Sequence, residues 1–469
     1  MPKQPYFQNA NERVIAWVIS CAMFMEALDT TIINTAIPAM AHSFQVDPID
    51  LKVALISYLL SLAIFIPISG WMADKFGSKR VFICSLWIFT LSSIWCGFSQ
   101  SIMELVCARV LQGVGGSMML PVGRLITLRT FGRERLVGAF NKIVTVGVLG
   151  SMLGPVLGGF ITSYWSWHWI FWVNIPFGLI AIWAAEKYFE ATPPEPTPAL
   201  DITGFILFGG GLAGLTFGLS ALSETIVPEI YSIAIILIAI LLLMSYFLHS
   251  RKIIHPIIKI QLFQYRTFRV SLLGNLFSRL SFGGVPFLLP LLLQIGLGYP
   301  PEISGIMLAP IALGVIVSKQ FILQLLKYFG YRNLLIINTI FLGMSIWSCM
   351  LINQDTSIYV IAFLSFMFGV LVSLQFSSMN SLAYTDIPAH YLSSAASAMS
   401  TIQQISQSFG VAVSALLLRY LSTPNSTQHF GLTPSIFHST FMVLGVLTLV
   451  SAVIYVDLKR DEGAQMISR

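Results

Sequence analysis

The stretch VIAWVISCAMFMEALDTTIINTAIP, from Val14 to Pro38, decides the fold class of this chain. It is long and apolar enough to cross the roughly 30 Å hydrocarbon core of a bilayer as a helix. Two acids, Glu26 and Asp29, interrupt it one helical turn apart. A charge at the centre of such a helix costs roughly 2.5–3.5 kcal/mol, so it usually faces a bundle interior or a water-filled cavity. The pair therefore predicts a functional site at membrane depth, and proton-linked transport is the first hypothesis.

The composition extends this interpretation to the whole chain. Of the 469 residues, 56% are hydrophobic and only 10% are charged, and the mean hydropathy is +0.81. Such values exclude ordinary soluble domains and predict an all-α polytopic membrane protein. Fourteen segments have the length of a transmembrane helix: 14–38, 51–71, 81–99, 101–125, 137–163, 168–188, 202–222, 230–249, 268–296, 303–326, 333–352, 357–381, 392–420 and 436–456.

Cysteine and histidine usage argues against a metal or disulfide site. The five cysteines fall inside predicted spans without CxxC spacing, and the seven histidines are scattered. We therefore expect no metal and no disulfide framework. The N-terminal residues lack the short apolar core and small-residue cleavage site of a removable signal peptide, so the first span is expected to remain as an anchor.

The net charge of +6 predicts topology rather than nucleic-acid binding. Lysine and arginine gather in alternate loops, whereas Lys52 and Arg419 are the exceptions near the ends of spans. Basic loops face the cytoplasm by the positive-inside rule, and an even number of spans places both termini there. The basic loops carry Lys75, Lys79 and Arg80; Arg124, Arg129, Arg133, Arg135 and Lys142; Arg251, Lys252, Lys259, Arg266 and Arg269; Lys327 and Arg332; and Lys459, Arg460 and Arg469.

A proline-rich segment divides the chain. EATPPEPTPALD, at 190–201, contains four prolines and favours an extended spacer between the sixth and seventh spans. The basic stretch after the eighth span either lies along the cytoplasmic interface as an amphipathic segment or is a plain loop. The predicted organisation is six plus two plus six: an N-terminal bundle at 1–190, a linker at 191–201, two additional helices at 202–250, a cytoplasmic amphipathic linker at 251–267, and a C-terminal bundle with a short cytoplasmic tail at 268–469.

The turn GWMADKFGSKR, Gly70 to Arg80, is the strongest single motif. Charges on such a turn can hold helix ends together in one conformation and release them in another. A static topology signal is the alternative. KYFGYR, at 327–332, occupies the corresponding place in the last six spans and suggests an internal repeat, which is common in secondary transporters. The gating residues that we predict here are Gly70, Asp74, Gly77, Lys79 and Arg80.

Further motifs follow in a fixed order and carry a resemblance to a known family. GWMADKFGSKR, LVCARVLQGVGGS at 105–117 and GSMLGPVLGG at 150–159 resemble the loop, fourth-helix and antiporter motifs of the major facilitator superfamily. LDTTIINTAIP at 28–38 and WHWIFWVNIPFG at 167–178 resemble signatures of its fourteen-helix drug:proton antiporter family, the EmrB/QacA type, and GRLITLRTF, FLLPLLLQIGLGYPP and FSSMNSL are most similar to the MdtD-like branch. The resemblance covers the whole chain, although Asn141 stands where the antiporter motif often has glycine.

The charges of spans one and four lie at similar depth. At about 1.5 Å rise per residue, Glu26 and Asp29 lie roughly 18 and 22 Å above the cytoplasmic end, and Arg109 lies at about 18 Å. We predict a proton-coupling site of Asp29, Glu26 and Arg109, in which one acid stays paired while the other exchanges a proton. A permanent Asp29–Arg109 pair that only joins two helices is the alternative. Asp29 matches the family motif, whereas Glu26 is a departure from it.

The remaining candidate residues are glycines of the fifth span and polar groups at membrane depth. The glycines form a smooth stripe that permits close helix packing. The family resemblance implies that this packing prevents leakage, and ordinary helix packing without a transport role is the alternative. A single glutamine in a span is often only an interhelical hydrogen-bonding group. The predicted antiporter motif is Gly150, Gly154, Pro155, Gly158 and Gly159, and the predicted substrate cavity is Thr30, Asn34, Gln112, Asn275, Arg279, Gln375, Gln403 and Gln407.

These features predict a proton-coupled antiporter that exports small organic compounds, with multidrug efflux as the first substrate class. An exporter of an anionic metabolite, such as citrate or a carboxylate siderophore, is the alternative, because Arg109 and Arg279 could bind a carboxylate. No GxxxxGK[ST] phosphate loop and no catalytic motif is present, so we expect neither ATP use nor an enzyme. The expected partners are a small-molecule substrate, protons and the bilayer, with no nucleic acid and no cofactor. A monomer in a bacterial inner membrane is the working assumption.

Overall fold

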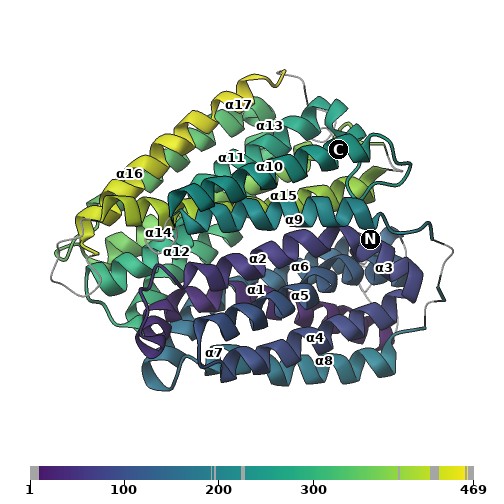
Figure 1. The fold of residues 1–469 in the computed structure, drawn as a ribbon, viewed down its shortest axis with the longest axis horizontal. Helices are drawn as coiled ribbons and strands as arrows, with labels where there is room; N and C mark the ends of the chain where they lie inside the picture. Colours follow the sequence, from purple (N-terminus) through teal and green to yellow (C-terminus); the bar gives the residue numbers. More distant parts are fainter. Residues whose placement is uncertain are drawn as a thin grey trace.

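Every regular element of the structure, a computed structural model, is helical over the residues that it describes (Figure 1). These are residues 10–131, 133–191, 193–194, 197–222, 228–388, 391–422, 432–459 and 462, without the side chains of 133–142, 144 and 393. The elements are α1 Ala10–Phe44, α2 Lys52–Phe65, η1 Ile66–Ile68, α3 Ser69–Phe76, α4 Ser78–Phe98, α5 Ile102–Thr130, α6 Arg133–Tyr164, α7 Trp169–Trp172, α8 Asn174–Tyr188, α9 Ile202–Ala221, α10 Glu229–Ser250, η2 Ile260–Gln264, α11 Arg266–Phe282, α12 Val285–Leu291, η3 Leu292–Gly296, α13 Pro301–Ser348, η4 Cys349–Leu351, α14 Ile358–Ala383, α15 Leu392–Leu421, α16 Pro434–Ser451 and α17 Val453–Val456.

Within the described residues, 12 helical segments are long and apolar enough to cross a membrane. The predicted number was fourteen, and two places account for the difference. The predicted spans 303–326 and 333–352 both lie in α13, which is non-helical at Gly330 (φ 69°, ψ 169°). The predicted span 392–420 corresponds to α15, whose many serines and glutamines keep it outside the twelve. An all-helical, multi-pass architecture is confirmed, whereas the count of fourteen stays a prediction.

Prolines and glycines break two predicted spans into shorter elements. The second span consists of α2, η1 and α3, and Pro67 is the second residue of the 3-10 turn between the two helices. The ninth span consists of α11, α12 and the π-helical turn η3; Gly283 and Gly284 separate the first two, and Pro286 is the second residue of α12. These breaks follow from the absence of a proline N–H and from the flexibility of glycine.

The helices form two bundles with α9 and α10 between them. In Figure 1 the N-terminal bundle, α1 to α8, is purple and blue, the C-terminal bundle, α11 to α17, is green and yellow, and α9 crosses the middle. Phe208 and Leu212 of α9 share an apolar core with Ala63 of the N-terminal bundle and with Ile405 and Phe409 of the C-terminal bundle. The additional pair therefore covers the seam between the bundles on one side.

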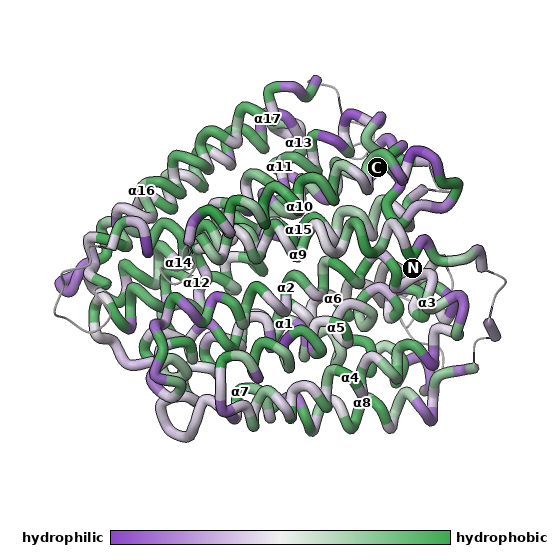
Figure 2. Tube along the Cα trace, viewed as in Figure 1, coloured by the Kyte–Doolittle hydropathy of each residue, from purple (hydrophilic) through white to green (hydrophobic). Residues whose placement is uncertain are grey.

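The residues along the helices are mainly hydrophobic, and hydrophilic residues gather at the helix ends and in the loops, as Figure 2 shows. On α10, Leu237, Ile238 and Leu241 are 57%, 57% and 62% exposed. Exposed leucine and isoleucine over several turns are expected where lipid rather than water surrounds a helix.

The turns between the second and third spans of each bundle both contain a glycine with positive φ. Gly77 ends α3 at φ 88° and Gly330 interrupts α13 at φ 69°, and both are preceded by phenylalanine. Positive φ is a conformation that glycine adopts without steric cost. The weak sequence similarity between GWMADKFGSKR and KYFGYR is therefore accompanied by a similar backbone conformation at Gly77 and Gly330.

The two ends of the molecule differ in how the bundles meet. We call the end that carries Gly70–Arg80 the basic end, and the end that carries residues 45–51 the distal end. At the basic end a cavity of about 800 Å³ extends between the bundles from Glu26 to Asp74. At the distal end the bundles touch, since Gln294 donates to the carbonyl of Thr35 (3.0 Å) and Ser163 bonds Glu302. The structure is therefore open at the basic end and closed at the distal end.

One ion pair joins the two bundles among the described residues. Arg419, at the end of α15, contacts Asp47 in the loop after α1 at 3.3 Å. Burial is the largest influence on this carboxyl group and raises the pKa of Asp47; repulsion from Asp50 acts in the same direction, while the N–H of Ile49 and the cations Arg419 and Lys52 oppose it. Asp47 therefore loses its charge, on acidification, at a higher pH than an ordinary aspartate does.

We expect Asp47→Asn to weaken distal closure. The pair is partly exposed, so its loss should shift the balance between closed and open distal ends by roughly fivefold, or about 1 kcal/mol. Spin labels at His42 and Tyr420, one on each bundle, would report this as a larger fraction of long distances in electron-resonance measurements. Acidification below neutral pH should produce the same shift in the parent protein and none in Asp47→Asn. A distance distribution that is identical in both proteins at every pH would contradict the role of the pair.

Candidate functional site

A buried ion pair lies at the centre of the N-terminal bundle. Arg109 of α5 and Asp29 of α1 are both 0% exposed, and Nη1 of the arginine lies 2.5 Å from Oδ2 of the aspartate. Two charges removed from water are stable only with close contact and further hydrogen bonds. The predicted residues of spans one and four are therefore in direct contact.

Other donors complete the coordination of Asp29. Gln112 donates to Oδ1 of Asp29 (2.9 Å), and Asn174 of α8 donates to the same oxygen (3.1 Å). Gln112 also accepts from Arg109 (2.7 Å) and donates to Ser93 of α4 (2.8 Å). Three donors, one of them charged, thus hold a single carboxylate.

The second helix covers the arginine from the remaining side. Nε of Arg109 donates to the carbonyl of Ala54 (3.3 Å), and its guanidinium lies 4.2 Å from the centre of the Tyr58 ring. The network therefore joins α1, α2, α4, α5 and α8. It contains three residues that the sequence analysis did not select, Ser93, Asn174 and Tyr58. Asn174 lies in the quoted stretch WHWIFWVNIPFG, where an amide among apolar residues was the available signal.

Glu26 occupies a different environment from Asp29. It lines the 800 Å³ cavity at the basic end, together with Ser117, Arg124 and Gln404. Its carboxylate has no hydrogen bond or ion pair to any described residue, and only its backbone carbonyl accepts a bond, from Thr30 (2.7 Å). Of the two acids, Glu26 is therefore the one placed to meet a solute.

A second, smaller cavity lies deeper between the bundles. Its volume is about 30 Å³, and its polar lining comprises Thr30, Asn34, Tyr58, Arg109 and Gln407. Thr30 and Asn34 were predicted to line a substrate cavity, and in this conformation they line only this water-sized space.

Arg279 is the corresponding cation of the C-terminal bundle. Its only side-chain hydrogen bond among the described residues is a long one to Gln407 (3.4 Å), and it lies 4.7 Å from the ring centre of Phe376. No acidic residue of the described chain forms an ion pair with it, and its Nε has no partner there. Phe376 lines the large cavity, so Arg279 lies directly behind the cavity wall.

The other predicted polar residues of the C-terminal bundle divide into two groups. Gln403 lines the large cavity, as predicted, and donates to Asn380 (2.7 Å). Gln375 and Asn275 are fully buried and line neither cavity, contrary to their predicted location. The amide of Asn275 donates to the carbonyl of Ser271 (3.1 Å) within its own helix.

Gln375 belongs instead to a neutral network inside the C-terminal bundle. It donates to Thr339 and to Tyr455 (both 2.9 Å) and accepts from Asn338 (2.7 Å), while Tyr455 also contacts Ser278 (3.0 Å). These residues lie on α11, α13, α14 and α17. The sequence shows that Gln375 is a polar residue within a span, but it does not show which face of α14 the side chain lies on.

Comparisons with known proteins agree with this geometry. The family model described as "Major Facilitator Superfamily" matches residues 19–411. The chain belongs to the major facilitator superfamily. It is 36% identical over 448 residues to a protein of Pectobacterium atrosepticum provisionally named multidrug resistance protein MdtD, with 96% of each chain covered. The corresponding protein of Escherichia coli K12 is 36% identical over 449 residues, covering 95% of this chain and 94% of that one. These relatives support the MdtD-like branch.

Solved structures of superfamily members share the fold. The POT family transporter PepTSo has a TM-score of 0.70 at 14% identity, covering 100% of this chain and 99% of that one. A D-xylose–proton symporter has a TM-score of 0.69 at 13% identity, covering 96% and 99%. The chain is thus a multi-pass membrane transporter, since its family and its relatives are transporters.

The superfamily loop motif makes its ion contacts inside the N-terminal bundle in this conformation. Asp74 lies 3.5 Å from Arg129 of α5, and Lys79 donates to the carbonyls of Glu186 (2.9 Å) and Phe189 (2.6 Å) at the end of α8. Gly77 has the positive φ that the turn requires, and Arg80 is exposed. Gly70 differs from its prediction as a turn residue, because it lies within α3 and lines the large cavity.

The antiporter motif of α6 faces two different helices. A Cβ on Gly150 would lie 2.5 Å from the carbonyl oxygen of Phe24, and Gly154 and Gly158 are equally tight against Thr31 and Ile32 of α1. Gly159 packs instead on Pro301 of the other bundle. The carbonyl of Pro155 packs on Gly305, also in α13. The motif therefore serves both the packing of α1 and the distal contact between the bundles.

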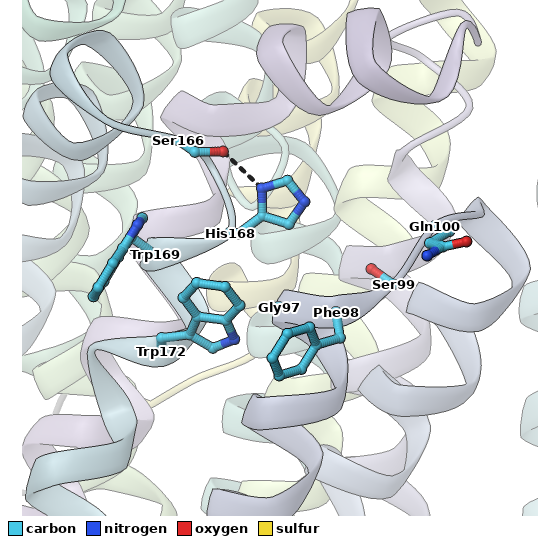
Figure 3. Close-up of a pocket in the computed structure, with 8 residues that line it drawn as sticks. All are labelled: Gly97, Phe98, Ser99, Gln100, Ser166, His168, Trp169 and Trp172. Carbon is cyan, nitrogen blue, oxygen red and sulfur yellow. Dashed lines mark hydrogen bonds between the residues drawn. The ribbon is translucent and has the colours of Figure 1, made fainter.

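An aromatic pocket at the distal end is separate from these sites (Figure 3). It has a volume of about 330 Å³, and Phe98, Trp169 and Trp172 form its walls. Ser166 bonds Nδ1 of His168 at 2.6 Å, and burial lowers the pKa of that imidazole. Tryptophans at this position match the aromatic belt of membrane proteins. Among the described residues no group of three or more His, Cys, Asp or Glu could hold a metal ion.

Removing one member of the buried pair should destabilise the fold. Asp29→Asn leaves the charge of Arg109 buried without a counter-charge, which costs about 3–5 kcal/mol. The double variant Asp29→Asn/Arg109→Gln should recover part of this loss, because both charges are gone. Chemical unfolding of the purified proteins would measure the coupling as a double-mutant cycle. Additive losses in the double variant would contradict a direct interaction.

Proposed function

We propose that this protein is a fourteen-span proton-coupled antiporter of the EmrB/QacA type that exports small organic compounds by alternating access. The observation that carries the proposal is the separation of the two acids. Asp29 is held by three donors, whereas the carboxylate of Glu26 faces a cavity of about 800 Å³ without a hydrogen-bond or ion-pair partner among the described residues. A free acid in a cavity large enough for a drug-sized ligand suits competition between a proton and a solute.

The mechanism that we propose places one exchange event at Glu26. In the conformation open at the basic end, the deprotonated carboxylate attracts a cationic compound into the cavity. After the molecule has switched to open at the distal end, a proton that binds Glu26 removes the charge and displaces the compound. Return with the proton and its release at the basic end restore the carboxylate and complete the cycle. Exchange of one proton for one monovalent cation moves no net charge, so the pH difference drives it; each net charge moved by further protons would add roughly 2.3 kcal/mol per 100 mV of membrane potential.

Charge distribution supports the direction of export. Basic residues concentrate at the end where the cavity opens, so the positive-inside rule makes this end cytoplasmic. Both termini would then be cytoplasmic and the bundles would sit in a bacterial inner membrane. The fourteen spans follow when α13 is divided at Gly330 and α15 is included. We propose no cofactor, because the proton gradient supplies the energy.

Glu26→Gln should uncouple transport from the proton gradient. The glutamine keeps the size of the side chain but can neither attract a cation nor exchange a proton. In inverted membrane vesicles, accumulation of a cationic dye driven by a pH gradient should fall roughly tenfold or more, equivalent to about 1.4 kcal/mol. Glu229→Gln, an exposed acid at the start of α10, is the matched control and should keep full accumulation. Undiminished dye accumulation by Glu26→Gln would refute the proposed role.

An exporter of anionic metabolites, such as citrate or a carboxylate siderophore, is the second candidate. Arg279 favours it, because this partly buried cation has no acidic partner among the described residues and contacts Phe376, which lines the large cavity. Charge-assisted hydrogen bonds to a carboxylate are the interaction that a guanidinium makes best.

Arg279→Ala distinguishes the two substrate classes. If the substrate is anionic, the variant should lose roughly tenfold or more of its carboxylate export while dye export stays intact. If the substrate is a cation, the variant should leave dye export unchanged or improve it, because a repulsive charge has been removed. Arg251→Ala, a basic-end arginine stacked on Phe247, controls for the loss of one positive charge. Both transport assays use the same vesicle preparation.

A further inference from the structure

Glu26 and the buried Asp29–Arg109 pair lie beside two different cavities that share no lining residue. Glu26 lines the large cavity, and Arg109, the partner of Asp29, lines the small one. Glu26 and Asp29 are nevertheless only one helical turn apart on α1. Something must therefore keep water and solutes of the large cavity away from the buried pair.

Tyr58 is the side chain that occupies this position. Its ring lies 4.2 Å from the guanidinium carbon of Arg109, and it is 1% exposed. Its hydroxyl lies at the other end of the ring, where a Cβ on Gly116 would be 3.3 Å away. Gly116 lines the large cavity. The phenol ring thus spans the distance from the buried cation to the cavity wall.

Glycines of α5 make room for this ring. A Cβ on Gly113 would lie 2.7 Å from the carbonyl oxygen of Tyr58 and 2.6 Å from Cβ of Ser61, closer than real side chains approach. Ser61 also donates to the carbonyl of Val110 (2.8 Å), which fixes α2 against α5. The glycines in the stretch LQGVGGS therefore have a local purpose, since they let α2 bring Tyr58 over Arg109.

Two buried polar atoms near the ring have no protein partner of ordinary hydrogen-bond geometry among the described residues. They are the hydroxyl of Tyr58 and Nη2 of Arg109. Both residues line the small cavity, which at about 30 Å³ is the size of one water molecule. Thr30, Asn34 and Gln407 supply further polar groups there. A buried water needs two to four such partners, and this site offers them.

We propose that Tyr58 is a positioning residue that separates the Asp29–Arg109 pair from the solvent of the large cavity while Glu26 stays in contact with that cavity. Its ring covers the guanidinium, and its hydroxyl shares one water in the small cavity with Arg109. A cationic solute then meets the charge of Glu26 without an exposed arginine beside it. The functional part of this inference rests on the proposed exchange at Glu26, but the barrier itself does not.

Cys96 provides a native reporter for the barrier. It is 0% exposed, and its Sγ lies 3.6 Å from Oε1 of Gln112, which binds both Arg109 and Asp29. Water that reaches the ion pair also brings small reagents to this thiol. A protein in which Cys21, Cys84, Cys107 and Cys349 are replaced by serine or alanine would retain Cys96 alone.

The test compares Tyr58→Phe with Tyr58→Ala in this background. Methyl methanethiosulfonate, a small neutral reagent, is added to the full-length protein, and intact mass follows the modification. Phenylalanine keeps the ring, so Cys96 should react as slowly as in the parent. Alanine removes the barrier, so modification should be roughly tenfold faster or more, because thiol reactivity follows access. Equal rates for parent and Tyr58→Ala, or for Phe and Ala, would overturn the proposal.

Tyr455→Ala is the matched control for general loosening. Tyr455 is a fully buried tyrosine of the C-terminal bundle and lies in a network without ionised groups. Its loss should leave Cys96 slow, and fast modification in this variant would also overturn the proposal. Because labelling does not require transport, failure of the barrier and failure of the exchange at Glu26 remain distinguishable. Intact dye transport by Glu26→Gln refutes only the latter.

Discussion

The buried Asp29–Arg109 ion pair is the constraint on which the N-terminal bundle depends. Its two charges are fully removed from solvent, so every group around them must compensate for lost hydration. Three helices, α2, α5 and α8, supply that compensation through Gln112, Asn174 and the carbonyl of Ala54, together with the ring of Tyr58. The same demand explains the glycines of α5, because bulkier residues there would push α2 away from the arginine. The ion pair thus determines how closely the helices pack. As a result, Glu26 lines the large cavity and Asp29 does not.

The C-terminal bundle solves the same packing problem without charge. Gln375, Asn338, Thr339 and Tyr455 join its helices by hydrogen bonds between neutral groups. A neutral network is less costly to bury than an ion pair and has no state that a proton could change at physiological pH. The shared positive-φ glycines, Gly77 and Gly330, indicate that the bundles are repeats of one design. Their polar centres differ, since the described acidic and basic residues of the bundle centres are Glu26, Asp29 and Arg109 in the first bundle and Arg279 in the second.

Sequence patterns predicted depth well and direction poorly. Helical rise alone placed Asp29 and Arg109 at similar heights, and the structure brings them into contact. Gln375 was predicted for the cavity because it is a polar residue within a span, but the sequence does not tell that its side chain points into its own bundle, since that depends on how α14 is rotated against α11 and α13. Asn174 was missed for a related reason, because its partner is 145 residues away in sequence. The number of membrane spans also depends on composition. α15 is a long helix, but it is rich in serine and glutamine and is therefore not among the twelve apolar segments.

Switching between conformations requires contacts that are specific and also weak enough to break. The distal closure meets this requirement, since among the described residues it combines one partly exposed ion pair, three hydrogen bonds and the backbone contact of Gly159 with Pro301. An exposed ion pair contributes about 1 kcal/mol or less, and a single hydrogen bond contributes at most roughly 1.5 kcal/mol. The Asp29–Arg109 pair, by contrast, costs several times more to separate, so it is suited to move as part of a rigid bundle. The buried ion pair therefore lies where the helices of one bundle stay together, and the partly exposed ion pair lies where the two bundles would have to separate.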